Sequence, residues 1–342
     1  MSYQMRNVLV TGGAGFIGIN FIQYMLNNNS TNIINIDKLT YASNSNHLQS
    51  LELFPRYTFV KGDITNDQLL KQIFEHYDID TVIHFAAESH VDKSIENSIN
   101  FINTNILGTY TLLETARKYW FDKLKMTVKQ AHESCRFHHV STDEVYGSLS
   151  SEDPSFTEET AFSPSSPYSA SKASSDHLVH AWFRTYKLPT TITNCSNNFG
   201  PYQHNEKFIP TVISHCINKT NIPIYGSGEN IRDWLYVEDH CKAILDVIKM
   251  GDVGGKWNIG GKNEWKNIEI ANLICNIFDK KFNSVNPHCH LIKHIDDRAG
   301  HDFRYSINPQ KIQEEIGWIP KDKSYFYKDL EKTVDWFLNN RF

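Results

Sequence analysis

Two groups of side chains near the middle of the chain have the residue types and the spacing that acid–base chemistry requires. The first is Thr142, Asp143 and Glu144, directly after a predicted buried strand, and the second is Tyr168 with Lys172. The last two are four residues apart in a predicted helix, so their side chains lie on one face. A lysine ammonium there would favour the phenolate form of the tyrosine, whose unperturbed pKa is about 10. The pair predicts a base that takes the hydroxyl proton during the oxidation of an alcohol, provided that a hydride acceptor binds nearby.

The N-terminus predicts that acceptor. Residues 6–11 form a predicted buried strand, which runs into Gly12-Gly-Ala-Gly-Phe-Ile-Gly18 and then into an apolar helix. This order of strand, glycine turn and helix is typical of dinucleotide-binding proteins, because the backbone N–H groups of the turn can approach a pyrophosphate at the helix N-terminus. Asp37 ends the next predicted strand. An acidic residue at this place accepts a hydrogen bond from the ribose 2′-hydroxyl of NAD and repels the 2′-phosphate of NADP. We therefore expect NAD rather than NADP, although the adjacent Lys38 weakens that preference.

Composition and length favour an intracellular enzyme. The chain has 342 residues and a net charge of −5, and it contains no basic run, so we expect neither nucleic-acid binding nor membrane binding. Its six cysteines form no Cys-x-x-Cys pair and are expected to be reduced cytoplasmic thiols. We expect no signal peptide and no membrane span, because the first strand starts within a few residues and no apolar run is long enough.

Strand and helix patterns alternate as in a doubly wound α/β sheet. Further strands are predicted at Tyr57–Lys61, Thr81–Ala86, Phe137–Ser141 and Thr190–Asn194. Helices are predicted at Asp67–His76, Ser98–Trp120 and Pro167–Lys187. We expect a Rossmann-type NAD-binding domain over residues 1–197, rejoined by part of 237–262, and a smaller α/β domain over 198–342 that binds the rest of the substrate. Functional residues are then expected at the carboxyl ends of the strands.

Several longer motifs carry a family resemblance over nearly the whole chain. They are Thr11–Gly18, Asp37–Tyr41, His84–Asp92, Ser141–Gly147, Tyr168–Lys172, Asn197–Gln203, Arg232–His240 and Asp297–His301. With them the chain resembles the extended short-chain dehydrogenase/reductases, and within that superfamily the dTDP-glucose 4,6-dehydratases. The chain departs from the family pattern at Ser43, Phe199 and Ala299, which concerns the fit of the substrate and not the chemistry.

The resemblance implies a reaction on a nucleotide hexose in which oxidation at C4 makes the C5 proton acidic. Tyr168 would take the proton of the 4-hydroxyl while C4 gives hydride to NAD, and Thr142 would donate a hydrogen bond to that oxygen. Glu144 would remove the C5 proton and Asp143 would protonate the departing 6-hydroxyl, after which hydride returns to C6. The cofactor ends as it began.

The strand ends and the resemblance together imply two sets of contact residues, which overlap at Ser89. Cofactor contacts are expected from Gly12, Gly15, Phe16, Ile17, Gly18, Asp37, Lys38, Thr40, Asp63, Ile64, Ala86, Ala87, Ser89, Thr104, Tyr168, Lys172 and Asn198. Substrate contacts are expected from Ser89, Thr142, Asn197, Lys207, Phe208, Pro223, Ile224, Tyr225, Arg232, Asn267, Arg298 and His301. Arg232 is the first choice for a bidentate contact with the diphosphate. The alternative for Arg232 is a surface ion pair with Asp233 or Glu229.

Alternative functions remain open at this point. The nucleotide carrier is dTDP or UDP. A 4-epimerase on the same scaffold would need no acid and base at C5 and C6, and Asp143 would repel the carboxylate that a decarboxylase must bind. A non-catalytic NAD-binding sensor would not require the Tyr168 and Lys172 pair.

Two further expectations concern metal binding and assembly. His132, Cys135, His138 and His139 are residue types that bind zinc, but successive strand residues face opposite sides, so we expect no metal site. The predicted helices near 98–120 and 167–187 carry more apolar side chains than one sheet face can bury. In relatives these helices form a dimer interface, and we expect a homodimer.

Overall fold

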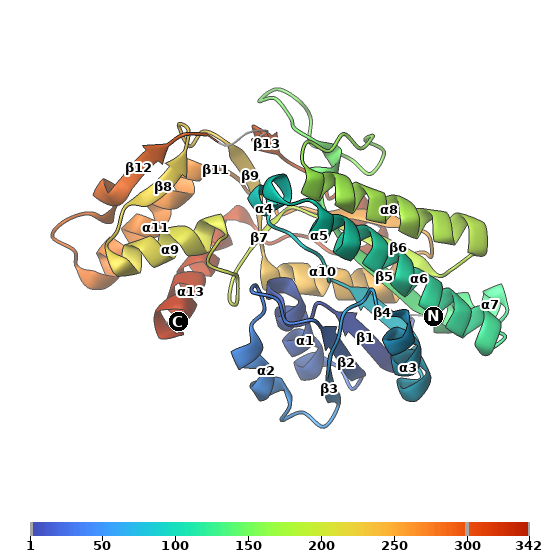
Figure 1. Ribbon diagram of the computed structural model, residues 1–342. Coiled ribbons are helices and arrows are strands. Elements are labelled where there is room, and N and C mark those ends of the chain that lie inside the picture. Colours follow the sequence, from blue (N-terminus) through green and yellow to red (C-terminus); the bar gives the residue numbers. More distant parts are fainter. Residues whose placement is uncertain (1–2, 298–300, 341–342) are drawn as a thin grey trace.

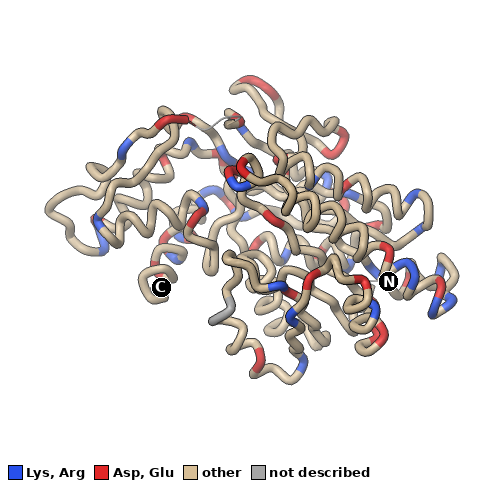
Figure 2. Tube along the Cα trace, in the orientation of Figure 1, with Lys and Arg blue, Asp and Glu red and all other residues tan. Residues whose placement is uncertain are grey.

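A computed structural model of the protein describes residues 3–297 and 301–340. The molecule has two parts, which Figure 1 shows side by side. The larger part surrounds a central sheet, and the smaller part holds most of the C-terminal elements, coloured yellow to red. Acidic and basic residues are interspersed along both parts (Figure 2). Within the described ranges, no helix is both long and apolar enough to cross a membrane.

The central sheet of the described chain has seven strands, and each is parallel to its neighbours. Their order is β10-β6-β5-β4-β1-β2-β3, so the chain starts in the middle, builds outward to β3 and then crosses to β4 on the other side. Doubly wound sheets bind their ligands where the order reverses, here between β1 and β4. The predicted Rossmann-type sheet is confirmed. The strands are β1 (Asn7–Thr11), β2 (Asn32–Asp37), β3 (Tyr57–Lys61), β4 (Thr81–His84), β5 (Arg136–Thr142), β6 (Thr190–Cys195) and β10 (Lys256–Ile259).

Helices cover both faces of this sheet and bury apolar side chains against it. On one face α1 (Phe16–Asn28), α10 (Val237–Met250) and α12 (Gln310–Ile316) share a core of aliphatic side chains. On the other face lie α3 (Asp67–Tyr77), α6 (Thr109–Arg117) and α8 (Pro167–Tyr186), with α7 (Val128–Ser134) at the end of the sheet. The buried face of α8, in contrast, is mostly polar. Burial of the strands from both sides explains why they are almost continuously apolar or threonine-rich.

The long helix predicted near 98–120 is present, but it is not a regular α-helix. Two π-helical stretches, Ile102–Gly108 and Lys118–Lys123, flank α6, and α5 (Ile99–Phe101) precedes the first. The carbonyl oxygen of Asn105 accepts hydrogen bonds from the hydroxyls of Thr109, at 2.5 Å, and Ser175, at 2.6 Å. These side chains compete with the backbone N–H groups for that carbonyl, which is a known cause of π-bulges.

The smaller part contains a mixed sheet and three helices packed on a separate apolar core. Its sheet strands are β7 (Asn197–Phe199), β9 (Ile231–Tyr236), β11 (Glu264–Lys266) and β13 (Arg304–Tyr305), and β8 (Ile222–Tyr225) pairs with β12 (Ile292–Ile295). The helices are α9 (Phe208–Asn218), α11 (Asn267–Phe282) and α13 (Phe326–Asn339). Two short helices, α2 (Ser45–Leu51) and α4 (Val91–Glu96), complete the larger part.

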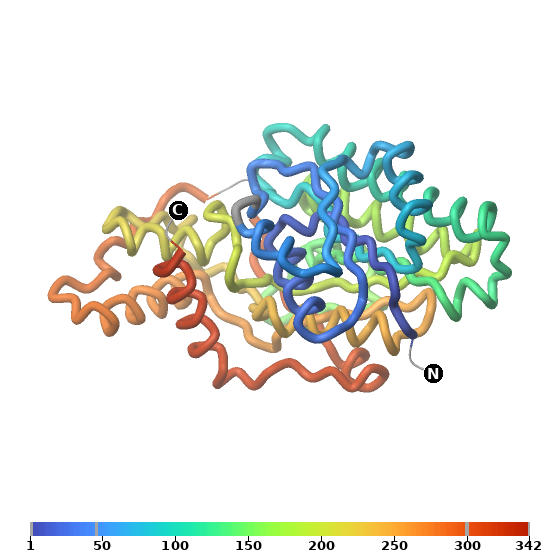
Figure 3. Tube along the Cα trace, turned by 90° about the horizontal axis from the view of Figure 1, so that it is seen from below, coloured from blue at the N-terminus to red at the C-terminus, as the bar shows by residue number. Residues whose placement is uncertain are grey.

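The chain crosses between the two parts more than once. The range 237–262, which we expected to rejoin the first domain, supplies α10 and the edge strand β10. Residues 310–318 also return, and Ile312 and Trp318 belong to the core under α1 and α10. Figure 3 shows this red C-terminal segment running along the larger part before it reaches the smaller one. The predicted domain boundary at 197/198 stays a prediction.

Candidate active site

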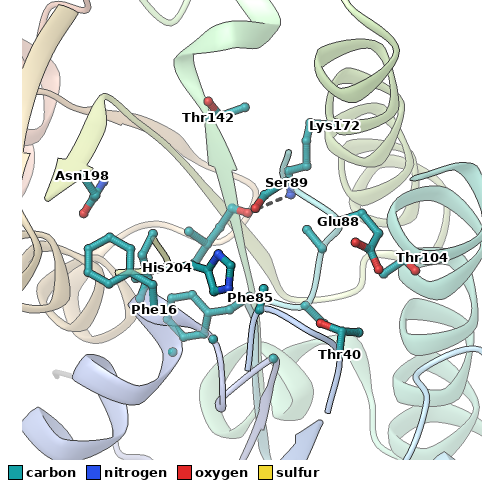
Figure 4. A pocket seen from close by; sticks show the side chains of 18 of the residues that line it. Phe16, Thr40, Phe85, Glu88, Ser89, Thr104, Thr142, Lys172, Asn198 and His204 are labelled. Carbon is teal, nitrogen blue, oxygen red and sulfur yellow. Dashed lines mark hydrogen bonds between the residues drawn. The ribbon is translucent and has the colours of Figure 1, made fainter. Parts of the chain in front are cut away.

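A cleft of about 300 Å³ opens at the carboxyl ends of the strands. Figure 4 shows side chains such as Thr142, Lys172, Ser89 and His204 arriving from different segments around one space. The structure brings every residue that we expected at the cofactor to the lining of this cleft. They are Gly12, Gly15, Phe16, Ile17, Gly18, Asp37, Lys38, Thr40, Asp63, Ile64, Ala86, Ala87, Ser89, Thr104, Tyr168, Lys172 and Asn198.

The glycine turn lies against the end of β4 with no room for side chains. Gly12 has φ +71°, and a Cβ added there would lie 2.6 Å from the Cα and N atoms of Ala86. A Cβ on Gly18 would collide with the carbonyl oxygen of Gly12. Helix α1 starts after Gly15 without a side-chain cap and has no acidic residue in its first turn. The positive end of α1 is therefore available to a phosphate, so this turn fits a dinucleotide.

Asp37 occupies the end of β2 at the rim of the same cleft. Its Oδ2 accepts a hydrogen bond from the N–H of Ala14 at 3.0 Å, and its Oδ1 accepts one from the N–H of Leu39 at 2.8 Å. Burial raises the pKa of Asp37, and these two hydrogen bonds oppose that effect. The carboxylate orders the glycine turn and retains oxygen lone pairs with which to meet a ribose. Lys38 turns aside and pairs with Glu88, the Nζ to Oε1 distance being 3.2 Å.

Thr142, Asp143 and Glu144 follow β5 directly. The hydroxyl of Thr142 accepts a hydrogen bond from the N–H of Glu144 at 3.2 Å and starts a single 3₁₀ turn, Asp143–Tyr146. The same hydroxyl donates to Oδ1 of Asp143 at 3.3 Å. Asp143 is only 1 % exposed, and among the described residues no donor contacts its Oδ2. Burial raises the pKa of Asp143 well above its usual range, and the Glu144 carboxyl raises it further, so Asp143 can hold a proton.

Tyr168 and Lys172 lie in the first turns of α8. Ser166 caps this helix through its hydroxyl, which accepts from the N–H of Ser169, and Pro167 starts it. Burial raises the pKa of Tyr168 well above 10, the Glu144 carboxylate adds to this, and a hydrogen bond with Thr142 lowers it. Lys172 is not among the main effects on this pKa, so the stabilisation of the phenolate that we expected from Lys172 stays a prediction.

The residues expected at the substrate divide into two groups. Four of them line the cleft, namely Ser89, Thr142, Asn197 and Lys207. The Nζ of Lys207 donates to the carbonyl oxygen of Ser89 at 2.7 Å, which links the segment before α4 to the loop before α9. The second group lies in the smaller part, outside the lining of the cleft, and comprises Phe208, Pro223, Ile224, Tyr225, Arg232, Asn267 and His301. Arg298 lies outside the described residues.

Arg232 is 5 % exposed and is surrounded by backbone oxygens. Its guanidinium donates to the carbonyls of Ile231 at 2.7 Å and Asp302 at 2.9 Å, and it lies over the ring of Tyr305. Of the two carboxylates that we considered as surface partners of Arg232, Glu229 pairs with Lys266, and Asp233 is buried and accepts from the N–H groups of Gly261 and Asn263. Arg232 opposes the rise in the pKa of Asp143, so its charge acts at the catalytic end of the cleft.

Sequence reasoning did not assign the loop between β7 and α9 to the cofactor side of the cleft. Gln203, His204 and Glu206 of this loop line the cleft beside Lys207. Glu206 accepts hydrogen bonds from Lys93 at 3.0 Å and from the hydroxyl of Tyr41 at 3.3 Å. This loop thereby closes one end of the cleft. The only local signal was its position directly after the Asn197–Gln203 motif.

The histidines that we considered for zinc make other contacts. His138 bonds to the hydroxyls of Thr191 and Thr193 on β6, while His139 contacts Lys172 and Asp176. Residues 3–297 and 301–340 contain no group of three side chains arranged to hold a metal ion.

Comparisons with known proteins agree with this site. The family model of GDP-mannose 4,6 dehydratase matches residues 9–325. A dTDP-glucose 4,6-dehydratase of Escherichia coli is 50% identical over 98% of this chain and 94% of its own length. The dTDP-glucose 4,6-dehydratase of Bacillus anthracis, solved in complex with NAD, has a TM-score of 0.84 and 43% identity over 98% of this chain and 97% of its own. DesIV of Streptomyces venezuelae, also a dTDP-glucose 4,6-dehydratase solved with NAD, has a TM-score of 0.86 and 40% identity over 98% of each chain.

Similarity at this level extends over both parts of the molecule and over every motif that carries the cleft. The chain belongs to the family of the dTDP-glucose 4,6-dehydratases.

Proposed function

We infer that the protein is a lyase that removes water from dTDP-glucose to give the 4-keto-6-deoxy sugar, with NAD as its bound cofactor. The observation that carries this inference is the arrangement of an acid and a base beside a redox tyrosine. Asp143, Glu144 and Tyr168 all line one cleft, and Thr142 contacts the first two of them. The family relationship supports the same conclusion.

The residues of this chain that would hold NAD are the glycine turn, Asp37 and the wall at Ala86 and Ala87. When bound, NAD supplies the hydride acceptor and returns the hydride to the sugar, so no net oxidation occurs. The turn at Gly12 and Gly18 leaves no space for side chains and therefore lets the backbone meet the pyrophosphate. The Asp37 carboxylate favours a free ribose 2′-hydroxyl.

We assign the proton transfers from the family resemblance, and the position of these side chains in one cleft supports the assignment. Tyr168 takes the proton of the 4-hydroxyl, and Thr142 stabilises the developing oxygen. Glu144 removes the C5 proton once C4 is a ketone. Asp143, whose pKa is raised by burial and by Glu144, gives its proton to the departing 6-hydroxyl. One neutral and one charged carboxyl side by side separate the acid from the base.

Two related reactions are less well supported by these residues. A 4-epimerase needs the reversible oxidation at C4 but has no use for a buried, protonated Asp143. A decarboxylase must bind a C6 carboxylate, and because the raised pKa of Asp143 lets it hold a proton, the repulsion that we expected from Asp143 would come from Glu144 instead. These catalytic residues do not distinguish thymine from uracil in the nucleotide carrier. The family relationship favours dTDP over UDP.

The test is the product formed by purified protein from dTDP-glucose and, in parallel, from UDP-glucose. We expect dTDP-glucose to lose the mass of one water and to yield a 4-ketone with an alkali-dependent ultraviolet chromophore. Epimerised sugar of unchanged mass would favour the epimerase. A higher kcat/KM for UDP-glucose would reassign the carrier.

We further propose that the protein is a homodimer located in the cytoplasm. The helical layer in front of α8 exposes about half of several large apolar side chains, which are Ile95, Ile99, Ile102, Leu107 and Tyr110. Burial of such a row is what a symmetric helix-to-helix contact provides. All six cysteines are free thiols, which supports a reducing compartment.

A further inference from the structure

Lys172 reaches the cleft through the interior of the protein. The residue is 4 % exposed, and its Nζ donates to the carbonyl oxygen of Val140 at 2.9 Å. The Nζ also lies 3.3 Å from Nε2 of His139. The pKa of His139 is well below its usual value, because the ring is fully buried and faces Lys172, so the imidazole is neutral. Neither contact supplies a negative charge, and a buried ammonium needs one.

A buried carboxylate lies one helical turn farther along α8. The side chain of Asp176 is 2 % exposed, and its Oδ1 lies 3.2 Å from Nε2 of His139. Its Oδ2 accepts a hydrogen bond from the side-chain amide of Asn194 at 2.9 Å. Both distances are to the same nitrogen, Nε2, so a neutral His139 that accepts a hydrogen bond from the ammonium of Lys172 does not also donate one to Asp176.

The other titratable groups around Lys172 are uncharged. They are Tyr168 from α8, His84 from β4, His139 from β5 and Cys195 from β6. Burial raises the pKa of Cys195 and lowers that of the two histidines, so these three stay neutral near pH 7. Burial also raises the pKa of Tyr168, so its phenol adds no charge in the resting protein, and it can act as a base only while a protonated Lys172 stabilises the phenolate. Burial also lowers the pKa of Lys172 to about 8, and Asp176 is the main group that opposes this effect. Burial raises the pKa of Asp176, and the charge of Lys172 leads the effects that oppose this rise, with Lys256 from β10 adding to them.

The arrangement also keeps the ammonium at the cleft. A direct ion pair would draw the Nζ of Lys172 toward Asp176 and away from Tyr168. Instead the imidazole of His139 meets both groups, and the carbonyl of Val140 fixes Nζ, so Lys172 remains part of the lining of the cleft.

We propose that Asp176 is a positioning residue for the catalytic pair: it is the buried counter-ion that keeps Lys172 protonated beside Tyr168, and His139 prevents the two charges from forming a direct ion pair. This inference rests on the proposed function, in which Tyr168 is the base of the first step. The proposal also gives a role to the buried His139, which we had considered only as a zinc ligand and then set aside.

The test is the pH profile of kcat/KM for dTDP-glucose with NAD-loaded protein. Lys172 is charged below its pKa and loses its charge as the pH rises through about 8, so wild-type activity should decline on the alkaline side. Asp176→Asn removes the negative charge that favours the ammonium, so the pKa of Lys172 should fall. The alkaline limb should then move to lower pH by about one unit, which is at the low end of the pKa shifts that a nearby opposite charge causes. At pH values above both limbs, the kcat/KM of Asp176→Asn should be about tenfold lower than that of the wild type. This factor adds to any difference in kcat/KM that the two proteins show at lower pH.

Two control variants separate charge from structure. Asp176→Glu keeps the charge, so its alkaline limb should coincide with that of the wild type even where its rate is lower. Asp122→Asn makes the same charge change on a side chain that is 57% exposed, and its profile should not move. An unchanged limb in folded Asp176→Asn would overturn the proposal, as would an equal shift in Asp176→Glu.

Circular dichroism decides whether Asp176→Asn is folded. Where it is not, Asn194→Ser takes its place, because it removes the donor that stabilises the Asp176 carboxylate and should move the limb in the same direction by a smaller amount. Its overall rate should also fall, since Asn194 donates to the carbonyl of Thr142 as well. A limb unmoved in Asn194→Ser overturns the proposal. Wild-type protein that does not dehydrate dTDP-glucose would instead overturn the proposed function, so the two failures are distinguishable.

Discussion

Replacement of Gly12 by alanine should weaken both the fold and the cofactor site, by an amount that the structure allows to be worked out. The residue has φ +71°, a backbone conformation that costs an L-residue about 1–2 kcal/mol. The new Cβ would also lie 2.6 Å from two backbone atoms of Ala86, and overpacking of this kind costs about 1–3 kcal/mol. The free energy of unfolding should therefore fall by about 2–5 kcal/mol.

Gly317 provides a matched control for the backbone term. It ends α12 with φ +80°, and an added Cβ there would meet nothing within 4 Å. Gly317→Ala should therefore lose only the conformational part, about 1–2 kcal/mol. The difference between the losses of unfolding free energy in the two variants therefore measures the cost of the collision with Ala86.

The assay is urea denaturation of both variants freed of NAD, because bound NAD adds a stabilisation that depends on its affinity, together with NAD binding by calorimetry. We expect Gly12→Ala to be the less stable variant and to bind NAD more weakly, because Ala86 lines the cleft and must shift. Equal losses of stability in the two variants, with NAD affinity unchanged in both, would refute the close approach of the turn to β4 as the reason for glycine at position 12.

Three other predictions concern the chemistry, the cofactor and the assembly. Glu144→Gln should still oxidise C4, so enzyme-bound NADH should accumulate in its absorbance spectrum, while Asp143→Asn should slow dehydration by roughly 10² to 10⁴; wild-type rates in both would contradict the assigned acid and base. Asp37→Ala should weaken NAD binding in calorimetry, and an unchanged affinity would mean that Asp37 serves only the backbone around it. Ile102→Glu places a charge in the exposed apolar row and should shift sedimentation toward the monomer, whereas a wild-type protein that is already monomeric at micromolar concentration would disprove the homodimer.

Much of the site could be predicted because its signals are local in the sequence. The glycine turn precedes its own helix, and Thr142 follows its own strand. Parallel strands bring all of their carboxyl ends to one edge, so separate local motifs were enough to place Gly12, Asp37 and Thr142 in one cleft.

The rest depends on contacts between residues far apart in the chain. Arg232 has the residue type of a phosphate ligand, but carbonyls from β9 and from the segment before β13 surround its guanidinium, and no local pattern specifies them. Glu206 lines the cleft in a loop that Lys93 and Tyr41 contact from distant parts of the chain. The π-helical stretch at 102–108 accepts a hydrogen bond from Ser175, which lies in another helix. Periodicity alone could not reveal any of these three features.

The position of β10 at the edge of the central sheet has a consequence for synthesis on the ribosome. Strand β6 is made long before its neighbour, and the segment from Cys195 to Lys256 takes roughly 3–12 s to translate at 5–20 residues per second. For that time the backbone of β6 is an unpaired edge, which is the kind of surface on which nascent chains aggregate. The sequence of β6 is Thr-Thr-Ile-Thr-Asn-Cys, so this strand is mostly polar while its edge is still unpaired. The hydroxyls that later bond to His138 in the core thus also make the unfinished sheet a poor template for other chains.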